Sequence, residues 1–159
     1  MKSFIYVAVA VLFSTTIAFA QATTATTLQG EWKVDAVNFS GINYNINTGK
    51  VLLLDASLTQ GQEVTEDDLN LLAAQVKEQL APFSGNSFTF TKDGVKIKLG
   101  YAERSGKFAL TQKETKNYIE ASFEDKGVKE FQYNFKNNQL YVYLPDESGA
   151  DIQLVFKRV

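Results

Sequence analysis

The sequence predicts a mainly β fold, an up-and-down antiparallel meander closed into a barrel of about 8–10 strands, with one amphipathic helix inserted early. Three observations favour this class. Beyond residue 87, apolar and polar residues alternate with period two in successive short segments. Turn-forming residues separate these segments at intervals of roughly 8–12 residues. A sheet with one apolar face must close or pack on another layer, so we expect a barrel, with a β-sandwich as the main alternative.

The composition is that of a globular domain. The chain has 159 residues, of which 45% are hydrophobic and 21% are charged, and it contains no cysteine and no histidine. These two absences exclude disulfides, thiol nucleophiles, Cys/His metal sites and imidazole-based triads. The net charge of −2 indicates no basic surface for nucleic acid or an anionic membrane. We expect no cofactor and no metal.

The first 20 residues have the pattern of a cleaved signal peptide. A positive start at Lys2 precedes the apolar run Phe4 to Phe13, and Ala18-Phe19-Ala20 predicts cleavage before Gln21. A membrane anchor is the alternative, but Ser14-Thr15-Thr16 interrupts the apolar run and no charged stop follows it. Lipid attachment to a mature N-terminus would need a cysteine. We therefore expect a soluble exported protein, periplasmic or extracellular, and not a lipoprotein.

The mature chain is predicted to begin with a leader and a strand. Residues 21–27 are small and polar, which indicates a flexible leader before a single barrel domain over 28–159. Residues 41–61 predict no single element. The segment between them alternates with period two and predicts a strand that carries on one face Leu28, Gly30, Trp32, Val34 and Ala36.

A helix is predicted over about 65–81. Thr65 is a favourable N-cap, and the acidic residues 66–68 lie in the first turn, where they stabilise the positive end of the helix dipole. Pro82 and Gly85 end the helix. One apolar stripe recurs at helical spacing, through Leu69, Leu72, Ala73, Val76 and Leu80. We expect this helix to pack on the sheet or close one end of a barrel, with a lid over a cavity mouth as the alternative.

At least six strands are predicted after the helix. The predicted turns fall at residues 92–94, 104–106, 113–116, 124–127, 136–138 and 145–149. Tyr141, Tyr143 and Val155 are predicted to face outward as a modest apolar strip. Aromatic side chains dominate the predicted inward face, and those that we expect to line a ligand cavity are Phe90, Tyr101, Phe108, Phe123, Tyr133 and Phe135.

Two segments resemble the lipocalins and their calycin relatives. Gly30-Glu31-Trp32 resembles the Gly-x-Trp signature of the first lipocalin strand, and the ending Leu154-Val155-Phe156-Lys157-Arg158 is similar to the last strand of exported bacterial lipocalin-like domains. The resemblance implies that Trp32 plugs one end of the barrel and that Arg158 lies across its indole ring through a cation–π contact. The early helix departs from the lipocalin order, so no subfamily's ligand is carried over.

We predict no enzymatic activity. Without histidine or cysteine, catalysis would need paired carboxylates, a Ser/Lys pair or an oxygen-ligand metal site. The acidic pairs Asp67-Asp68, Glu124-Asp125 and Asp146-Glu147 lie at a helix start or in predicted turns, where capping and solvation explain them. A carboxylate-dependent hydrolase is the least favoured hypothesis.

Ligand binding is the leading functional hypothesis. An eight-stranded barrel has room for its own side chains or for one small ligand, so the aromatic set could line a pocket or fill the core. We expect a small hydrophobic or amphipathic molecule as partner. The alternative is a packed barrel that serves as a protein-interaction module at the cell envelope, without a small ligand, through the helix and the surface around Tyr141 and Tyr143.

Overall fold

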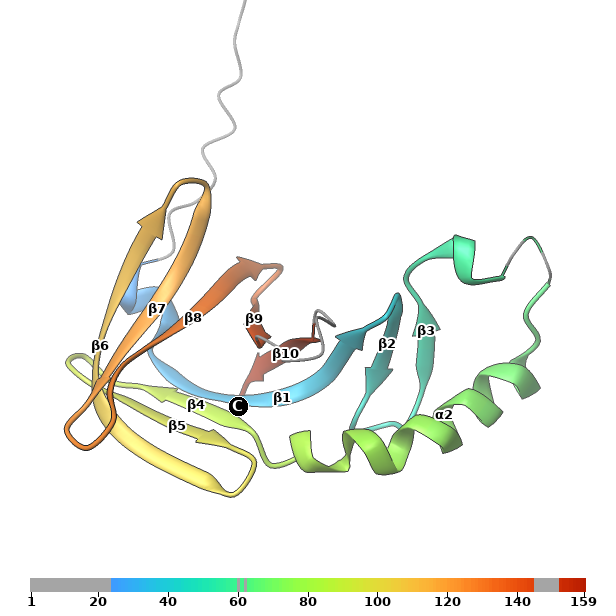
Figure 1. Ribbon diagram of the computed structural model, residues 1–159, viewed down its shortest axis with the longest axis horizontal. Helices are drawn as coiled ribbons and strands as arrows, with labels where there is room; N and C mark the ends of the chain where they lie inside the picture. The colour runs from blue at the N-terminus through green and yellow to red at the C-terminus, as the bar shows by residue number, and fades with distance from the viewer. Residues whose placement is uncertain (1–23, 60, 62, 145–151) are drawn as a thin grey trace, which may run out of the picture.

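The computed structural model describes residues 24–59, 61, 63–144 and 152–159 (Figure 1). The predicted signal peptide and the predicted turn at 145–149 lie outside the described residues. Within these residues the helical elements are α1 (Ala25–Leu28), η1 (Ala56–Thr59), α2 (Glu66–Leu80) and η2 (Ala81–Phe83). The strands are β1 (Gly30–Phe39), β2 (Ile42–Asn45), β3 (Val51–Leu53), β4 (Ser87–Phe90), β5 (Val95–Leu99), β6 (Ala102–Lys113), β7 (Lys116–Phe123), β8 (Gly127–Lys136), β9 (Gln139–Leu144) and β10 (Ile152–Arg158).

The predicted barrel is confirmed. Strands β4 to β10 follow one another as an antiparallel meander, and β10 pairs with β1 to close the sheet. One edge of β1 is taken by β10, while its other edge pairs with β4 through Gly30–Lys33 and with β2 through Ala36–Phe39. Eight strands therefore form the closed barrel, and β2 and β3 continue the sheet beyond it, as the extension at the right of Figure 1.

The first strand is bulged, which corrects the predicted alternation. The register between β1 and β10 shifts between Val34 and Ala36, so Asp35 is the extra residue. A bulge moves the following side chains to the opposite faces of the sheet. Val37 rather than Ala36 therefore joins the core cluster with Trp32 and Val34. The alternation seen in the sequence continued through residue 36 and gave no sign of this shift.

The N-terminal boundary also differs from the prediction. Residues 25–27, assigned to the flexible leader, belong to α1 together with Leu28. Thr24 caps this short helix by accepting a hydrogen bond from the backbone N–H of Thr27. Leu28, predicted to lie in the first strand, is instead fully buried at the end of α1. Threonine caps a helix start through its hydroxyl, which explains why this polar segment is ordered.

The helix prediction is confirmed. Thr65 and Asp68 form a reciprocal capping box at the start of α2, and η2 follows its end at Pro82. The hydroxyl and backbone N–H of Thr65 both donate to the Asp68 carboxylate and hold its pKa below the ordinary value. Val76 and Leu80 are buried in the core cluster. The helix packs along β3 (Figure 1), so it covers the β2–β3 extension. Among the described residues no helix is both long and apolar enough to cross a membrane.

One predicted turn is wrong, and its correction changes the barrel interior. Residues 104–106 lie within β6, whereas the turn between β5 and β6 is formed by Gly100 and Tyr101. Gly100 has φ of +60°, a conformation that favours glycine. The chain therefore reverses four residues earlier than the Arg104-Ser105-Gly106 sequence indicated.

Candidate functional site

Trp32 occupies one end of the barrel, beside α1. Its indole N–H donates to the carbonyl oxygen of Leu28 at 2.7 Å, and the side chain is only 1% exposed. The guanidinium carbon of Arg158 lies 4.7 Å from the centroid of the Trp32 ring, and an Arg158 N–H donates to the carbonyl of Thr27. The structure thus brings together the two residues that the resemblance paired. A buried ring held by a hydrogen bond and a cation closes the aromatic core at this end. A hollow of about 620 Å³, lined mostly by polar side chains of the β8–β9 turn and of β10, lies against Trp32 and Arg158.

Aromatic rings fill the middle of the barrel. Phe88 is fully buried and stacks on Phe90 with centroids 5.8 Å apart. It also meets Phe131 and Phe156 edge to face at 5.6 and 5.2 Å. These are the separations of rings in direct contact. The described part of the aromatic cluster is therefore core, and a ligand has to bind at its margin.

Five of the six predicted cavity residues fall into three groups. Phe90 and Tyr133 are buried core residues, and Phe108 is half-buried with its ring 5.0 Å from that of Phe90. Phe135 lies at the closed end, edge to face with Trp32 at 5.9 Å. Phe123 is the one member of the predicted set that lines the candidate site described next.

Tyr101 is a wrong prediction. Its side chain is fully exposed, because Leu99 and Ala102 form the last pair of the β5–β6 hairpin and Tyr101 lies in the turn beyond them. The period-two series of β5 ends at Leu99, so it does not extend to Tyr101. At the tip of a two-residue turn the side chain no longer follows the pleat of the strand, so the ring points to solvent and not into the barrel.

The candidate site is an apolar cup at the other end of the barrel. Turns of an up-and-down barrel alternate between its two ends, so the β5–β6 and β7–β8 turns lie opposite the β8–β9 turn, which borders Trp32. The cup opens at the end that carries the β5–β6 and β7–β8 turns, and it has a volume of about 230 Å³. Ile97 and Phe123, only 4% and 6% exposed, form its buried walls. Its full lining is Ile97, Leu99, Ala102, Arg104, Phe123, Lys129 and Phe131.

The cup has a continuous floor. Phe131 lines the cup and also meets Phe88 edge to face, so the aromatic core begins directly beneath it. A molecule seated here would contact apolar side chains on β5, β7 and β8 and would leave part of its surface toward solvent. Small ligands bind most often in such concave apolar sites that carry a few polar groups.

Arg104 and Lys129 are cup residues that the sequence analysis did not single out. Arg104 pairs across the sheet with Ile97, and Lys129 pairs with Ala121, both of which are buried in the core cluster. Directly paired residues lie on the same face, so both cations belong to the inward face. A signal was present: counting back in steps of two from Phe108 reaches Arg104, just as counting back from Phe131 reaches Lys129.

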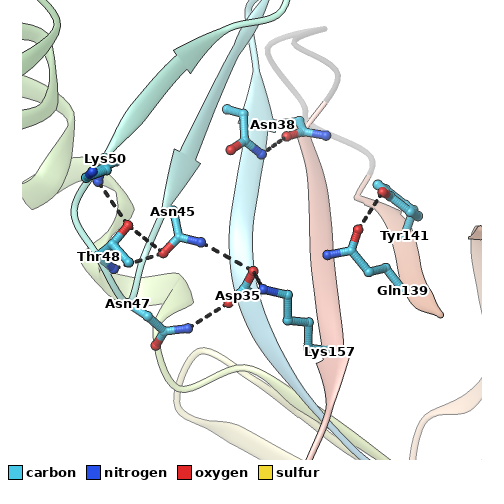
Figure 2. Close-up of polar contacts among 10 residues, drawn as sticks. Asp35, Asn38, Asn45, Asn47, Thr48, Lys50, Gln139, Tyr141 and Lys157 are labelled. Carbon is cyan, nitrogen blue, oxygen red and sulfur yellow. Dashed lines mark hydrogen bonds and ion pairs between the residues drawn. The ribbon is translucent and has the colours of Figure 1, made fainter. Parts of the chain in front are cut away.

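A polar cluster on the outer face fixes the bulge. The Asp35 carboxylate accepts hydrogen bonds from the side-chain amides of Asn47 at 2.9 Å and Asn45 at 3.3 Å, and it pairs with Lys157 at 2.7 Å (Figure 2). The backbone carbonyl of Asp35 also accepts from the N–H of Ile46. These contacts join β1, β10 and the loop after β2, so we interpret the cluster as structural.

The predicted outward strip lies next to this cluster. Tyr141 and Tyr143 are half-buried, and Val155, which pairs with Tyr141, is buried outside the inner core cluster. The Tyr141 hydroxyl donates to the side-chain oxygen of Gln139 at 2.9 Å (Figure 2). The strip therefore presents ring edges and amide groups and forms no continuous exposed apolar surface.

Of the acidic residues considered for catalysis, the neighbours Glu124 and Asp125 line a surface hollow of about 560 Å³ together with Lys107. Asp68 belongs to the capping box of α2, Glu124 and Asp125 lie in the β7–β8 turn, and residues 146–147 lie outside the described residues. No group of three or more acidic side chains placed to hold a metal ion occurs in the part of the chain that the structure describes.

Comparison with known proteins adds no further constraint: no family model matches the chain, and no curated protein or solved structure is significantly similar to it. The fold, the closed end and the cup are therefore the basis for any functional assignment.

Proposed function

We propose that this chain is an exported lipocalin-like protein that binds a small hydrophobic or amphipathic molecule and catalyses no reaction. The observation that carries the proposal is the apolar cup formed by β5, β7 and β8 at the end of the barrel away from Trp32. Its walls are inward-facing side chains of a closed barrel, which hold their positions without a ligand. A preformed apolar site avoids much of the entropic cost of ordering on binding.

The lining of the two ends favours the cup as the binding end, because the hollow of about 620 Å³ beside Trp32 is lined mostly by polar side chains, whereas apolar side chains form most of the cup. Trp32, Arg158 and α1 close the opposite end, and the aromatic core fills the space between. The proposal therefore places the ligand at the mouth of the barrel, where Phe123 and Phe131 are the aromatic contacts. Of the six rings expected from the sequence to line a cavity, it keeps only Phe123.

The volume of the cup limits the ligand. At about 230 Å³ it is smaller than the 300–1,000 Å³ that is typical of sites for drug-sized molecules. A single aromatic ring or a short hydrocarbon chain fits inside this volume, and a larger molecule such as a three-ring fluorescent probe would leave its remaining rings in the open mouth. Export is part of the proposal on the signal-peptide pattern of residues 1–20, and secretion with cleavage before Gln21 is checked by N-terminal sequencing of the exported protein.

A fluorescence titration with the neutral probe N-phenyl-1-naphthylamine tests the binding function. Ala102 is exposed at the rim of the cup, so Ala102→Trp fills the cup without disturbing the core. Ala109, exposed on the same strand but outside the cup, provides the matched control Ala109→Trp. We expect the probe to brighten with the wild type and Ala109→Trp, and its affinity to fall at least ~10-fold with Ala102→Trp.

Two results would contradict the proposal. One is an absence of probe binding to the wild type, and the other is equal binding to the two tryptophan variants. Native mass spectrometry before and after organic extraction provides an independent measurement, because a co-purified mass lost on extraction would identify the class of ligand directly.

A second candidate function is protein interaction at the cell envelope. The observation that favours it is the edge strand β3, whose outer edge pairs with no strand among the described residues and beside which Leu52 and Leu54 are exposed. Envelope pull-downs with the wild type, Leu52→Lys and Tyr141→Ser/Tyr143→Ser variants separate this function from small-molecule binding. A partner lost only with Leu52→Lys would favour the β3 edge. If the wild type captures no partner, the result would argue against the interaction function.

A further inference from the structure

Two cations stand at the mouth of the cup. Arg104 on β6 and Lys129 on β8 both line it, and β7 lies between these strands with Phe123 on its inward face. Arg104 is half-buried and Lys129 is exposed. The cup therefore combines apolar walls with two positively charged groups that approach its opening from both sides of Phe123.

Neither cation has a carboxylate partner within the described residues. Two nearby lysines do have such partners: Lys96 on the outer face of β5 pairs with Glu103 at 2.9 Å, and Lys113 on β6 pairs with Glu120 at 3.3 Å and also with Glu130. These two Glu neighbours raise the pKa of Lys113 above its usual value. Exposed Lys98 and Lys107 also have no carboxylate partner in the described part of the chain, so what distinguishes Arg104 and Lys129 is their place on the lining of the cup. Acidic residues outnumber basic ones in the chain, 18 to 16, so carboxylates are not scarce.

The arrangement matches an amphipathic anion. A cation beside apolar walls loses part of its hydration and gains from a counter-ion that the protein itself does not provide. Guanidinium binds a carboxylate with two parallel hydrogen bonds, and a lysine ammonium adds a flexible point charge. A ligand with a carboxylate at the opening and a hydrocarbon portion in the cup would satisfy both features.

We propose that the preferred ligand of the cup is a small monocarboxylate that carries a short hydrocarbon chain or one ring, with Arg104 and Lys129 binding its carboxylate. This inference rests on the binding function proposed above. The volume of about 230 Å³ excludes a large lipid from full enclosure, so the hydrocarbon portion is short. Arg104 provides orientation, because its planar fork fixes the direction of the carboxylate, whereas Lys129 provides charge.

Competition against N-phenyl-1-naphthylamine tests the preference. Octanoate and octan-1-ol have the same chain length and differ in the charge of the head group. Octanoate is expected to displace the probe from the wild type at a concentration at least ~10-fold lower than octan-1-ol, which corresponds to about 1.4 kcal/mol. Because the preference is electrostatic, it is expected to weaken as salt is raised.

Charge-neutral variants locate the head-group contact. Arg104→Gln and Lys129→Gln are each expected to lower the affinity for octanoate by about 3- to 10-fold and to leave the affinity for octan-1-ol unchanged. The matched controls are Lys107→Gln on β6 and Lys136→Gln on β8, which remove exposed lysines of the same strands from outside the cup. Arg104→Lys keeps the charge but loses the planar fork, so it is expected to retain only part of the preference for octanoate.

The outcomes separate the two proposals. Equal displacement by octanoate and octan-1-ol in the wild type would overturn the anion preference, while continued probe binding would leave the binding function in place. Equal effects of the cup and control variants would also overturn it. A wild type that binds no probe would overturn both. If Arg104→Gln fails to fold, Lys129→Gln and the salt dependence of octanoate binding to the wild type still test the anion preference.

Discussion

Replacing Trp32 by phenylalanine tests whether the Trp32 end of the barrel is a structural plug. The change removes the indole N–H that donates to the buried carbonyl of Leu28 at 2.7 Å. An orphaned buried acceptor costs about 1–3 kcal/mol. The smaller ring also weakens the cation–π contact with Arg158, which is worth roughly 0.5–1 kcal/mol where the cation is exposed. We expect Trp32→Phe to lower the free energy of unfolding by about 1.5–4 kcal/mol.

Urea unfolding followed by far-ultraviolet circular dichroism measures this change without relying on the lost tryptophan signal. At about 3 °C per kcal/mol the melting temperature should fall by roughly 5–12 °C. Arg158→Gln completes a double-mutant cycle, and the coupling energy should be positive and near the cation–π value. A loss below about 0.5 kcal/mol for Trp32→Phe, or no coupling to Arg158, would refute the plug.

The remaining predictions concern the core, a close contact and the helix cap. Phe88→Ala deletes the ring at the centre of the aromatic cluster and should cost about 3–5 kcal/mol in urea unfolding; a loss under 1 kcal/mol would mean that the core is loose. At Gly106 an added Cβ would lie 2.1 Å from the Ser122 carbonyl oxygen, so Gly106→Ala should destabilise the protein by about 1–3 kcal/mol. An unchanged melting temperature in this variant would contradict the close contact. Thr65→Ala removes the N-cap of α2 and should cost about 1 kcal/mol. It should also let the pKa of Asp68 rise toward the model-compound value of 3.8, as an NMR titration would show. Because the folded pKa of Asp68 is lowered, its contribution to stability is present above the unfolded pKa and is lost as pH falls through the folded pKa. This pH dependence should become smaller in Thr65→Ala, in which the backbone N–H of residue 65 still donates to the carboxylate.

The elements that could be predicted from the sequence are those specified by local chemistry. The capping residues of α2, its apolar stripe and the Asn137-Asn138 turn, in which both residues have positive φ, depend on nearby residues alone. The bulge at Asp35 depends on how β1 pairs with β10, more than 100 residues later, so no local pattern announces it. The β2–β3 extension was unreadable for a similar reason: its strands of four and three residues are held by β1 and α2.

The site was only partly predictable because residues typical of turns also occur inside a strand of this barrel. Arg104-Ser105-Gly106 has the composition of a turn, yet the chain reverses at Gly100 and continues through these residues as strand. Glycine at 106 has a packing role there: it allows close approach to the backbone of Ser122 and to the ring of Phe123. Because Gly106 lies in β6, the alternation of inward-facing residues extends from Phe108 to Arg104, which places a cation in the site.

Solvation of strand ends is the main competing explanation for Arg104 and Lys129. Polar residues at the mouth of any barrel improve hydration, and that requirement is indifferent to the sign of the charge. On β6 and on β8, however, the inward series includes a cation near the same end of the barrel, in a chain with more acidic than basic residues. The double variant Arg104→Glu/Lys129→Glu separates the two explanations. It preserves hydration, so its melting temperature should stay within about 3 °C of the wild type, a shift near 1 kcal/mol. Its octanoate binding should be abolished, because two like charges would then face the carboxylate. Retained octanoate binding would leave solvation as the sufficient explanation.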